Sequence, residues 1–173
     1  EIDRWVISLL NTLVKDVAAY YEDYEPTKAG RAISDFVGEN LSNWYVRLNR
    51  KRYWGGDYNE DKISAYQTLY TCLLTVSKLM APIAPFYADR LYQDLTGESS
   101  VHLADFPTFD EKLIDKNLEE CMQLAQQTSS MILALRRKAE LKVRQPLLKA
   151  VVPAPDEKTY EQINYIAELI KAE

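Results

Sequence analysis

The chain has 173 residues, of which 47% are hydrophobic and 27% are charged, and its formal net charge is −5. These are ordinary values for a globular protein, so they exclude disorder as the default state and allow one domain with a real core. No run approaches the roughly eighteen consecutive apolar residues of a membrane-spanning helix, and no signal peptide is recognisable. We therefore expect a cytoplasmic protein without a membrane partner.

Apolar residues recur at three- and four-residue steps through most of the chain, which is typical of amphipathic helices. Helices are expected over residues 2–22, from Pro26 to about Arg52, from Ile63 to Met80, over 86–95 with an end at Thr96-Gly97, and from about 115 to 141. Residues 98–109 between them have an extended character. The predicted fold is an all-α, up-and-down helical bundle.

The character of the sequence changes after Arg144-Gln145-Pro146. The stretch LLKAVVP is short, rich in β-branched residues and predicts a strand, and the remainder is helical again. We therefore expect a bundle over residues 1–145 and the start of a small α+β unit over residues 146–173. The chain begins at Glu1 without a methionine and stops within a helical pattern, which is expected of a piece of a longer protein.

Residues suited to catalysis or metal binding are scarce. No GxSxG, HExxH or phosphate-binding glycine loop is present. Cys72 and Cys121 lie in apolar helical patterns and are interpreted as core residues, and His102 is interpreted as a structural histidine in a packed strand. One histidine and two cysteines do not make a zinc site. We expect no catalytic residue, no metal and no cofactor site in this chain.

The negative net charge hides two basic segments. Residues 40–54 carry +4 and residues 134–149 carry +5, which leaves −14 for the rest. The first contains LSNWYVRLNRKRYW, with four cations, four aromatic residues and no acid. In a helix Leu41, Trp44, Tyr45 and Leu48 would point inward, whereas Arg47, Arg50 and Lys51 would share an outer flank. Cations at a helix end also complement its dipole without any partner, but four of them favour a polyanion with aromatic rings available for stacking.

The second basic segment, ALRRKAELKVRQPL, lies at another expected helix end. Its cations have the same two interpretations, a helix-dipole role and a polyanion site, and the sequence leaves both open. The sequence also leaves open whether the two segments lie on one side of the bundle.

Three stretches, ISDFVGENLSNWYVRLNRKRYW, AYQTLYTCLLTVSKLMAPIAPFYADRLYQDL and SVHLADFP, closely resemble the anticodon-binding helical domain of class I aminoacyl-tRNA synthetases of the isoleucine, valine and leucine group. Within that group, SVHLADFP together with ALRRKAELKVRQPLLKAVV and INYIAELIKAE is similar to the isoleucyl-tRNA synthetases. The resemblance covers nearly the whole chain. It implies a parent enzyme that attaches isoleucine to its tRNA with ATP and Mg²⁺.

The resemblance also implies partners and site residues. The partners would be an isoleucine-accepting tRNA and the catalytic domain of the same parent chain, because the HIGH and KMSKS signatures of the catalytic domain are absent here. By resemblance, the candidate RNA contacts are Trp44, Arg47, Arg50, Lys51, Arg52, Arg136, Arg137, Lys142 and Arg144. Two alternatives stay open: a helical scaffold that braces a catalytic domain without touching RNA, and the same domain of a valyl- or leucyl-tRNA synthetase.

Overall fold

The structure is a computed structural model that describes residues 1–143 and 145–172, with side chains described for 1–143, 145–168 and 170. Among these residues every regular element is a helix, which confirms the all-α prediction. The chain divides into two compact units, Glu1–Asp115 and Lys116–Glu173. The domain boundary that the sequence predicts after residue 145 is not tested by this division and stays a prediction.

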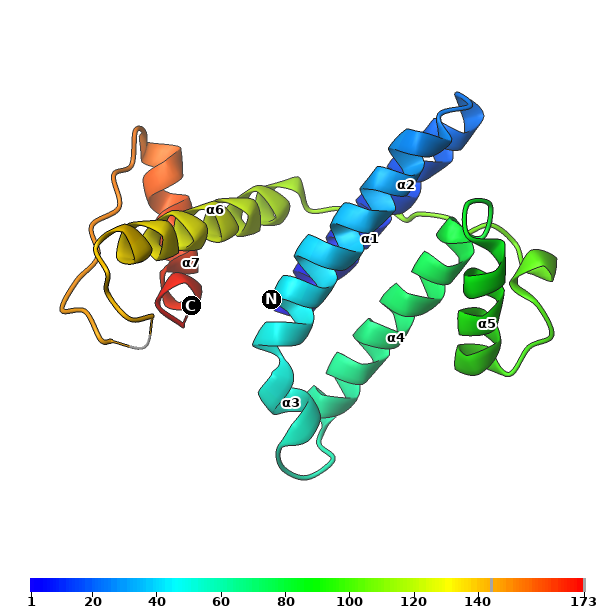
Figure 1. Cartoon of the computed structure of the whole chain (residues 1–173), viewed down its shortest axis with the longest axis horizontal. Helices are drawn as coiled ribbons and strands as arrows, with labels where there is room; N and C mark the ends of the chain where they lie inside the picture. Colours follow the sequence, from blue (N-terminus) through cyan, green and yellow to red (C-terminus); the bar gives the residue numbers. More distant parts are fainter. Residues whose placement is uncertain (144, 173) are drawn as a thin grey trace. The chain divides into compact units, whose positions relative to one another are not determined.

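The first unit is built, in chain order, from three long helical rods and one shorter helix (Figure 1). Helix α1 (Ile2–Glu22) packs against α2 (Pro26–Asp35), and both pack against α4 (Glu60–Met80), which in turn packs against α5 (Pro85–Thr96). The second rod begins with α2 and continues through the π-helix η1 (Phe36–Val46) to the five-residue helix α3 (Arg50–Trp54). Short 3₁₀ turns follow α5 at η2 (Val101–Leu103) and η3 (Glu111–Leu113).

Local chemistry explains where these helices begin and end. Pro26 and Pro85 occupy first-turn positions, where the missing N–H costs no hydrogen bond. The Asn59 side chain accepts a 2.8 Å hydrogen bond from the Lys62 N–H and so caps the start of α4. Gly97 closes α5 in the left-handed conformation (φ 74°), as the sequence predicts. These signals confirm the ends expected near residues 26 and 96.

The core of the first unit lies between α1, the second rod and α4. Its largest fully buried side chains include Trp5, Tyr45 and Leu79. Cys72 is also buried in this unit, and Cys121 is buried in the other, which confirms both thiols as core residues.

The second rod differs from the uninterrupted helix that its apolar stripe predicts. Residues 36–46 are π-helical, and the rod is interrupted by a turn at Asn49, which is buried. The Asn49 side-chain amide donates a 2.8 Å hydrogen bond to the Tyr45 carbonyl oxygen. A buried amide therefore satisfies the backbone at the break and lets α3 start as a separate short helix.

The second unit pairs α6 (Lys116–Lys138) with α7 (Glu157–Ala172). Helix α6 ends in a Schellman arrangement: Glu140 is left-handed (φ 55°), and the Leu141 N–H bonds the Arg136 carbonyl at 2.9 Å. An ion pair between Lys158 Nζ and Glu120 Oε2 (2.8 Å) joins the two helices. Both helices agree with the periodicity of the sequence.

Two sequence predictions are not confirmed by the described residues. The strand expected at LLKAVVP does not form, and residues 146–154 are an irregular connection. A strand needs a partner for its hydrogen-bond ladder, and the described chain offers none. His102 lies in the 3₁₀ turn η2 and is exposed, so its interpretation as a histidine in a packed strand is wrong.

Within the described residues, no helix combines the length and the apolar character needed to cross a membrane.

Candidate nucleic-acid interface

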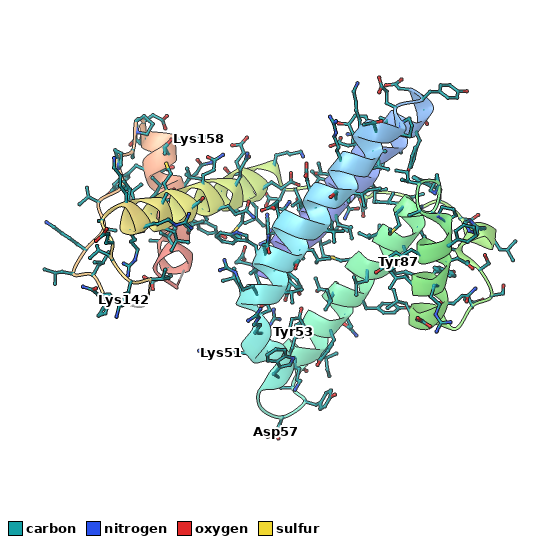
Figure 2. All side chains as sticks on the ribbon, in the orientation of Figure 1. Lys51, Tyr53, Asp57, Tyr87, Lys142 and Lys158 are labelled. Carbon is teal, nitrogen blue, oxygen red and sulfur yellow. The ribbon has the colours of Figure 1, made fainter. Side chains whose placement is uncertain are left out.

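The first basic segment places three of its four cations on the surface. Arg50 and Lys51 lie on α3 and Arg47 lies just after η1, and all three side chains are exposed. Figure 2 shows Lys51 projecting away from α3, whereas Tyr53 lies toward α4. Within the part of the chain that the structure describes, neither Arg50 nor Lys51 forms an ion pair. Their charges are therefore not neutralised by neighbouring carboxylates.

Arg47 is oriented by its own rod. Its Nε donates a 2.7 Å hydrogen bond to the Asn43 carbonyl oxygen, and its guanidinium lies 6.0 Å from the centre of the Trp44 ring, at the limit of a cation–π contact. Trp44 itself is only 8% exposed. The structure therefore places Trp44 beneath Arg47 as support, with little of its ring open to a stacking base.

Trp54 and Tyr58 are the exposed aromatic residues of this region. Trp54, the last residue of α3, is 82% exposed, and Tyr58 in the following loop is 80% exposed. The loop runs through Gly55 and Gly56, and Asp57 marks its tip in Figure 2. Lys62 Nζ lies 4.8 Å from the centre of the Tyr58 ring. The RNA contacts predicted from the sequence include Trp44 but not Trp54, although the position of Trp54 at the end of the helical stripe was a usable signal.

Arg52 is arranged differently from its three neighbours. Its side chain is 18% exposed and lies between two acids from other helices, Asp3 of α1 and Asp61 of α4. Nη1 and Nη2 each donate a 2.8 Å hydrogen bond to one carboxylate oxygen of Asp3, and Nε donates a 2.9 Å bond to Asp61 Oδ2. The carboxylates that neutralise Arg52 lie 49 and nine residues away in sequence.

Asp3 is the electrostatic centre of this arrangement. Burial raises its pKa, but the hydrogen bonds from Arg52 and from the Tyr45 hydroxyl (2.7 Å) outweigh burial, so the net pKa lies below its ordinary value. The hydrogen bond with Asp3 raises the pKa of Arg52, and burial together with Asp3 raises the pKa of the Tyr45 hydroxyl. Asp3 therefore stays ionised and Arg52 stays charged at neutral pH.

Among its described residues, the second basic segment also contains one cation bonded within the protein and several exposed ones. Arg136 Nη2 donates to the carbonyl oxygens of Lys142 (2.6 Å), Val143 (2.8 Å) and Gln145, so it shapes the connection after α6. Arg137, Lys138 and Lys142 are exposed, and Figure 2 shows Lys142 on this connection. Arg144 lies outside the described residues. The two basic segments belong to different compact units.

This arrangement suits the binding of a polyanion. Exposed guanidinium and ammonium groups donate to phosphate oxygens, and an exposed indole offers a face on which a base can stack. In the described part of the chain, no three His, Cys, Asp or Glu side chains are grouped so as to hold a metal ion.

Comparison with known proteins places this surface in a family context. Residues 3–152 match a family model described as the anticodon-binding domain of tRNA ligase. The isoleucine–tRNA ligases of Bacteroides fragilis and Porphyromonas gingivalis are 63% and 64% identical over the whole chain, which spans 16% and 15% of their lengths. That of Dehalococcoides mccartyi strain CBDB1 is 52% identical over 92% of the chain, which spans 16% of its length.

Proposed function

Because the chain belongs to the family of anticodon-binding domains of tRNA ligases, we propose that it docks the anticodon stem and loop of a tRNA on α3 and its flanks. The observation that carries the proposal is the exposure of Arg50, Lys51 and Trp54 together on one five-residue helix of an acidic chain. A short helix that presents both charge and a ring can approach a bent nucleic-acid loop closely.

The side chains would have different roles in RNA recognition. Arg47, Arg50 and Lys51 bind phosphate oxygens and set the register of the RNA, and Trp54 stacks on an unpaired base. Trp44 contributes by supporting Arg47. Arg137 and Lys142 of the second unit form a further phosphate-binding set, whereas Arg136 organises the connection that carries Lys142. Arg144 is retained from the family resemblance.

We further propose that the RNA is an isoleucine-accepting tRNA, because relatives with the name isoleucine–tRNA ligase match the whole chain. In that setting the chain serves an ATP-dependent ligase in the cytoplasm, and the catalytic domain of the same parent is its second partner. ATP and Mg²⁺ act in that catalytic domain. Residues 1–145 form the docking bundle, and residues 146–173 begin a further subdomain.

Binding to an isoleucine tRNA transcript at several salt concentrations tests the proposal. If the three exposed cations of the first segment each neutralise one phosphate, they contribute about −2 to −3 to the slope of the logarithm of the affinity against the logarithm of salt. When salt rises from about 50 to about 200 mM, this contribution alone lowers affinity roughly 20- to 40-fold. The double substitution Arg50→Ala/Lys51→Ala should make this slope shallower by about 1.4 to 1.8.

A charge-matched control distinguishes docking from a general effect of net charge. Lys28→Ala/Arg31→Ala removes two exposed cations from the same rod, roughly 30 Å before α3. The proposal expects this variant to bind tRNA within about twofold of wild type, because exposed charges at that distance are screened. Equal losses in both double variants would instead indicate a general effect of net charge, and no loss in either would support the alternative of a helical scaffold that does not touch RNA.

A further inference from the structure

Arg52 has no hydrogen-bond donor left for a phosphate. A guanidinium offers five N–H groups. Nη1 donates to Asp3 Oδ1 (2.8 Å) and to Asn49 Oδ1 (3.0 Å), Nη2 donates to Asp3 Oδ2 (2.8 Å) and to the Asp61 carbonyl oxygen (2.9 Å), and Nε donates to Asp61 Oδ2 (2.9 Å). An RNA phosphate could bind this group only after one of these bonds was broken.

The charge of the group also argues against attraction of RNA. Arg52 contributes +1, and Asp3 and Asp61, both paired with it, contribute −2, so the three side chains together carry −1. This negative set borders the two exposed cations of α3, Arg50 and Lys51. Because the group carries a net charge of −1, any contribution of Arg52 to RNA binding comes from the geometry that it fixes and not from its charge.

The geometry that it fixes is the position of α3. This helix has five residues and follows the turn at Asn49, so its own hydrogen bonds hold it weakly. Arg52 ties it to the first turn of α1 through Asp3 and to the first turn of α4 through Asp61. The Tyr45 hydroxyl donates to the same Asp3 carboxylate at 2.7 Å, which joins the π-helical segment to the network.

We infer that Arg52 is a positioning residue: it holds α3 so that Arg50, Lys51 and Trp54 face the RNA, and it does not itself bind phosphate. The inference rests on the proposed function. It changes the meaning of the basic motif, because the cation expected to be a fourth RNA contact becomes the support for the other contacts.

A double-mutant cycle on tRNA affinity tests this inference. Arg52→Lys keeps the positive charge but loses the paired N–H groups that match a carboxylate. We expect Arg52→Lys to lower tRNA affinity about three- to tenfold in the wild-type background, and less than twofold in the Arg50→Ala/Lys51→Ala background, where fewer contacts remain to be positioned. An equal loss in both backgrounds means that Arg52 acts independently and overturns the inference.

Asp3→Asn gives a second test, because a phosphate-binding Arg52 and a positioning Arg52 predict opposite changes in tRNA affinity. If Arg52 bound phosphate, removal of a negative charge beside it would free its guanidinium and strengthen tRNA binding. If Arg52 positions α3, the same substitution weakens binding. Tighter binding by Asp3→Asn therefore overturns the inference.

Amide hydrogen exchange provides a readout without RNA. Exchange at Tyr53 should speed up in Arg52→Lys and in Asp3→Asn, because α3 is loosened, and should be unchanged in Lys51→Ala. Unchanged exchange in both network variants overturns the inference even if tRNA binding is affected. If Arg50→Ala/Lys51→Ala binds tRNA as the wild type does, both the inference and the proposed interface fail, whereas additive losses leave the interface standing and remove only the positioning role.

Discussion

Replacement of Trp54 by alanine should weaken RNA binding without unfolding the protein. The side chain is 82% exposed, so folding buries only about a fifth of its surface. On a ring residue that can bury up to ~250 Å², this is roughly 45 Å² and about 1 kcal/mol of unfolding free energy at most. A base stacked on the indole contributes about 1–3 kcal/mol of binding free energy, which corresponds to a roughly 5- to 150-fold loss of affinity.

The assay is a titration of labelled isoleucine tRNA with Trp54→Ala, Trp54→Phe and wild type at several salt concentrations. Because stacking neutralises no phosphate, the salt slope of Trp54→Ala should equal that of the wild type while the affinity falls at every salt concentration. Trp54→Phe keeps an aromatic face and should recover part of the loss.

Tyr87→Ala is the matched control. Tyr87 is an aromatic residue of α5 that is 64% exposed, and it lies apart from α3 within the same unit (Figure 2). This variant should bind tRNA as the wild type does. Wild-type affinity of Trp54→Ala, or a parallel loss in Tyr87→Ala, would refute the assignment of Trp54 as a stacking surface.

Three further predictions concern the fold. Trp5 is 2% exposed in the core of the first unit, so Trp5→Ala should lower the free energy of unfolding in urea by about 3–5 kcal/mol, in contrast to Trp54→Ala. Burial, with a smaller contribution from Asp3, raises the pKa of the Cys72 thiol to about 12, so a thiol reagent at about pH 8 should label Cys72 only after the protein is unfolded; rapid labelling of the native protein would contradict its burial. The pKa of Asp3 is lowered in the folded state, so its contribution to stability is present at neutral pH and is lost as the pH falls below about 4 through the folded pKa. Urea unfolding at successive pH values should therefore show a shallower acid loss for Asp3→Asn than for the wild type.

The helices could be predicted from the sequence because their signals are local. Apolar spacing indicates each helix, and Pro26, Pro85 and Gly97 mark ends that the structure confirms. The π-helical register of residues 36–46 could not be predicted, because the apolar stripe through Phe36 and Trp44 is compatible with either helix. The strand expected after Pro146 was inferred from a short stretch with β-branched residues and a closing proline, and a strand depends on a partner that the described residues do not provide.

The candidate site was predictable in composition but not in the roles of its members. Four cations in one short segment indicate a basic surface, and Arg50 and Lys51 are exposed as the helical spacing implies. The role of Arg52 depends on Asp3, which is 49 residues away, and tertiary packing alone brings the two together. For the two tryptophans the sequence was more informative, because helical spacing predicts an inward Trp44 and the structure confirms its burial, whereas Trp54 is exposed at the end of α3.

The proposed separation of roles within α3 defines a practical starting point for altering RNA preference. A combinatorial library that randomises positions 50, 51 and 54 and keeps Arg52, Asp3 and Asp61 constant would vary the recognition surface on an intact foundation. Variants could be selected from such a library for binding to tRNAs with changed anticodon loops. Each randomised side chain is solvent-exposed, so these substitutions leave the core untouched.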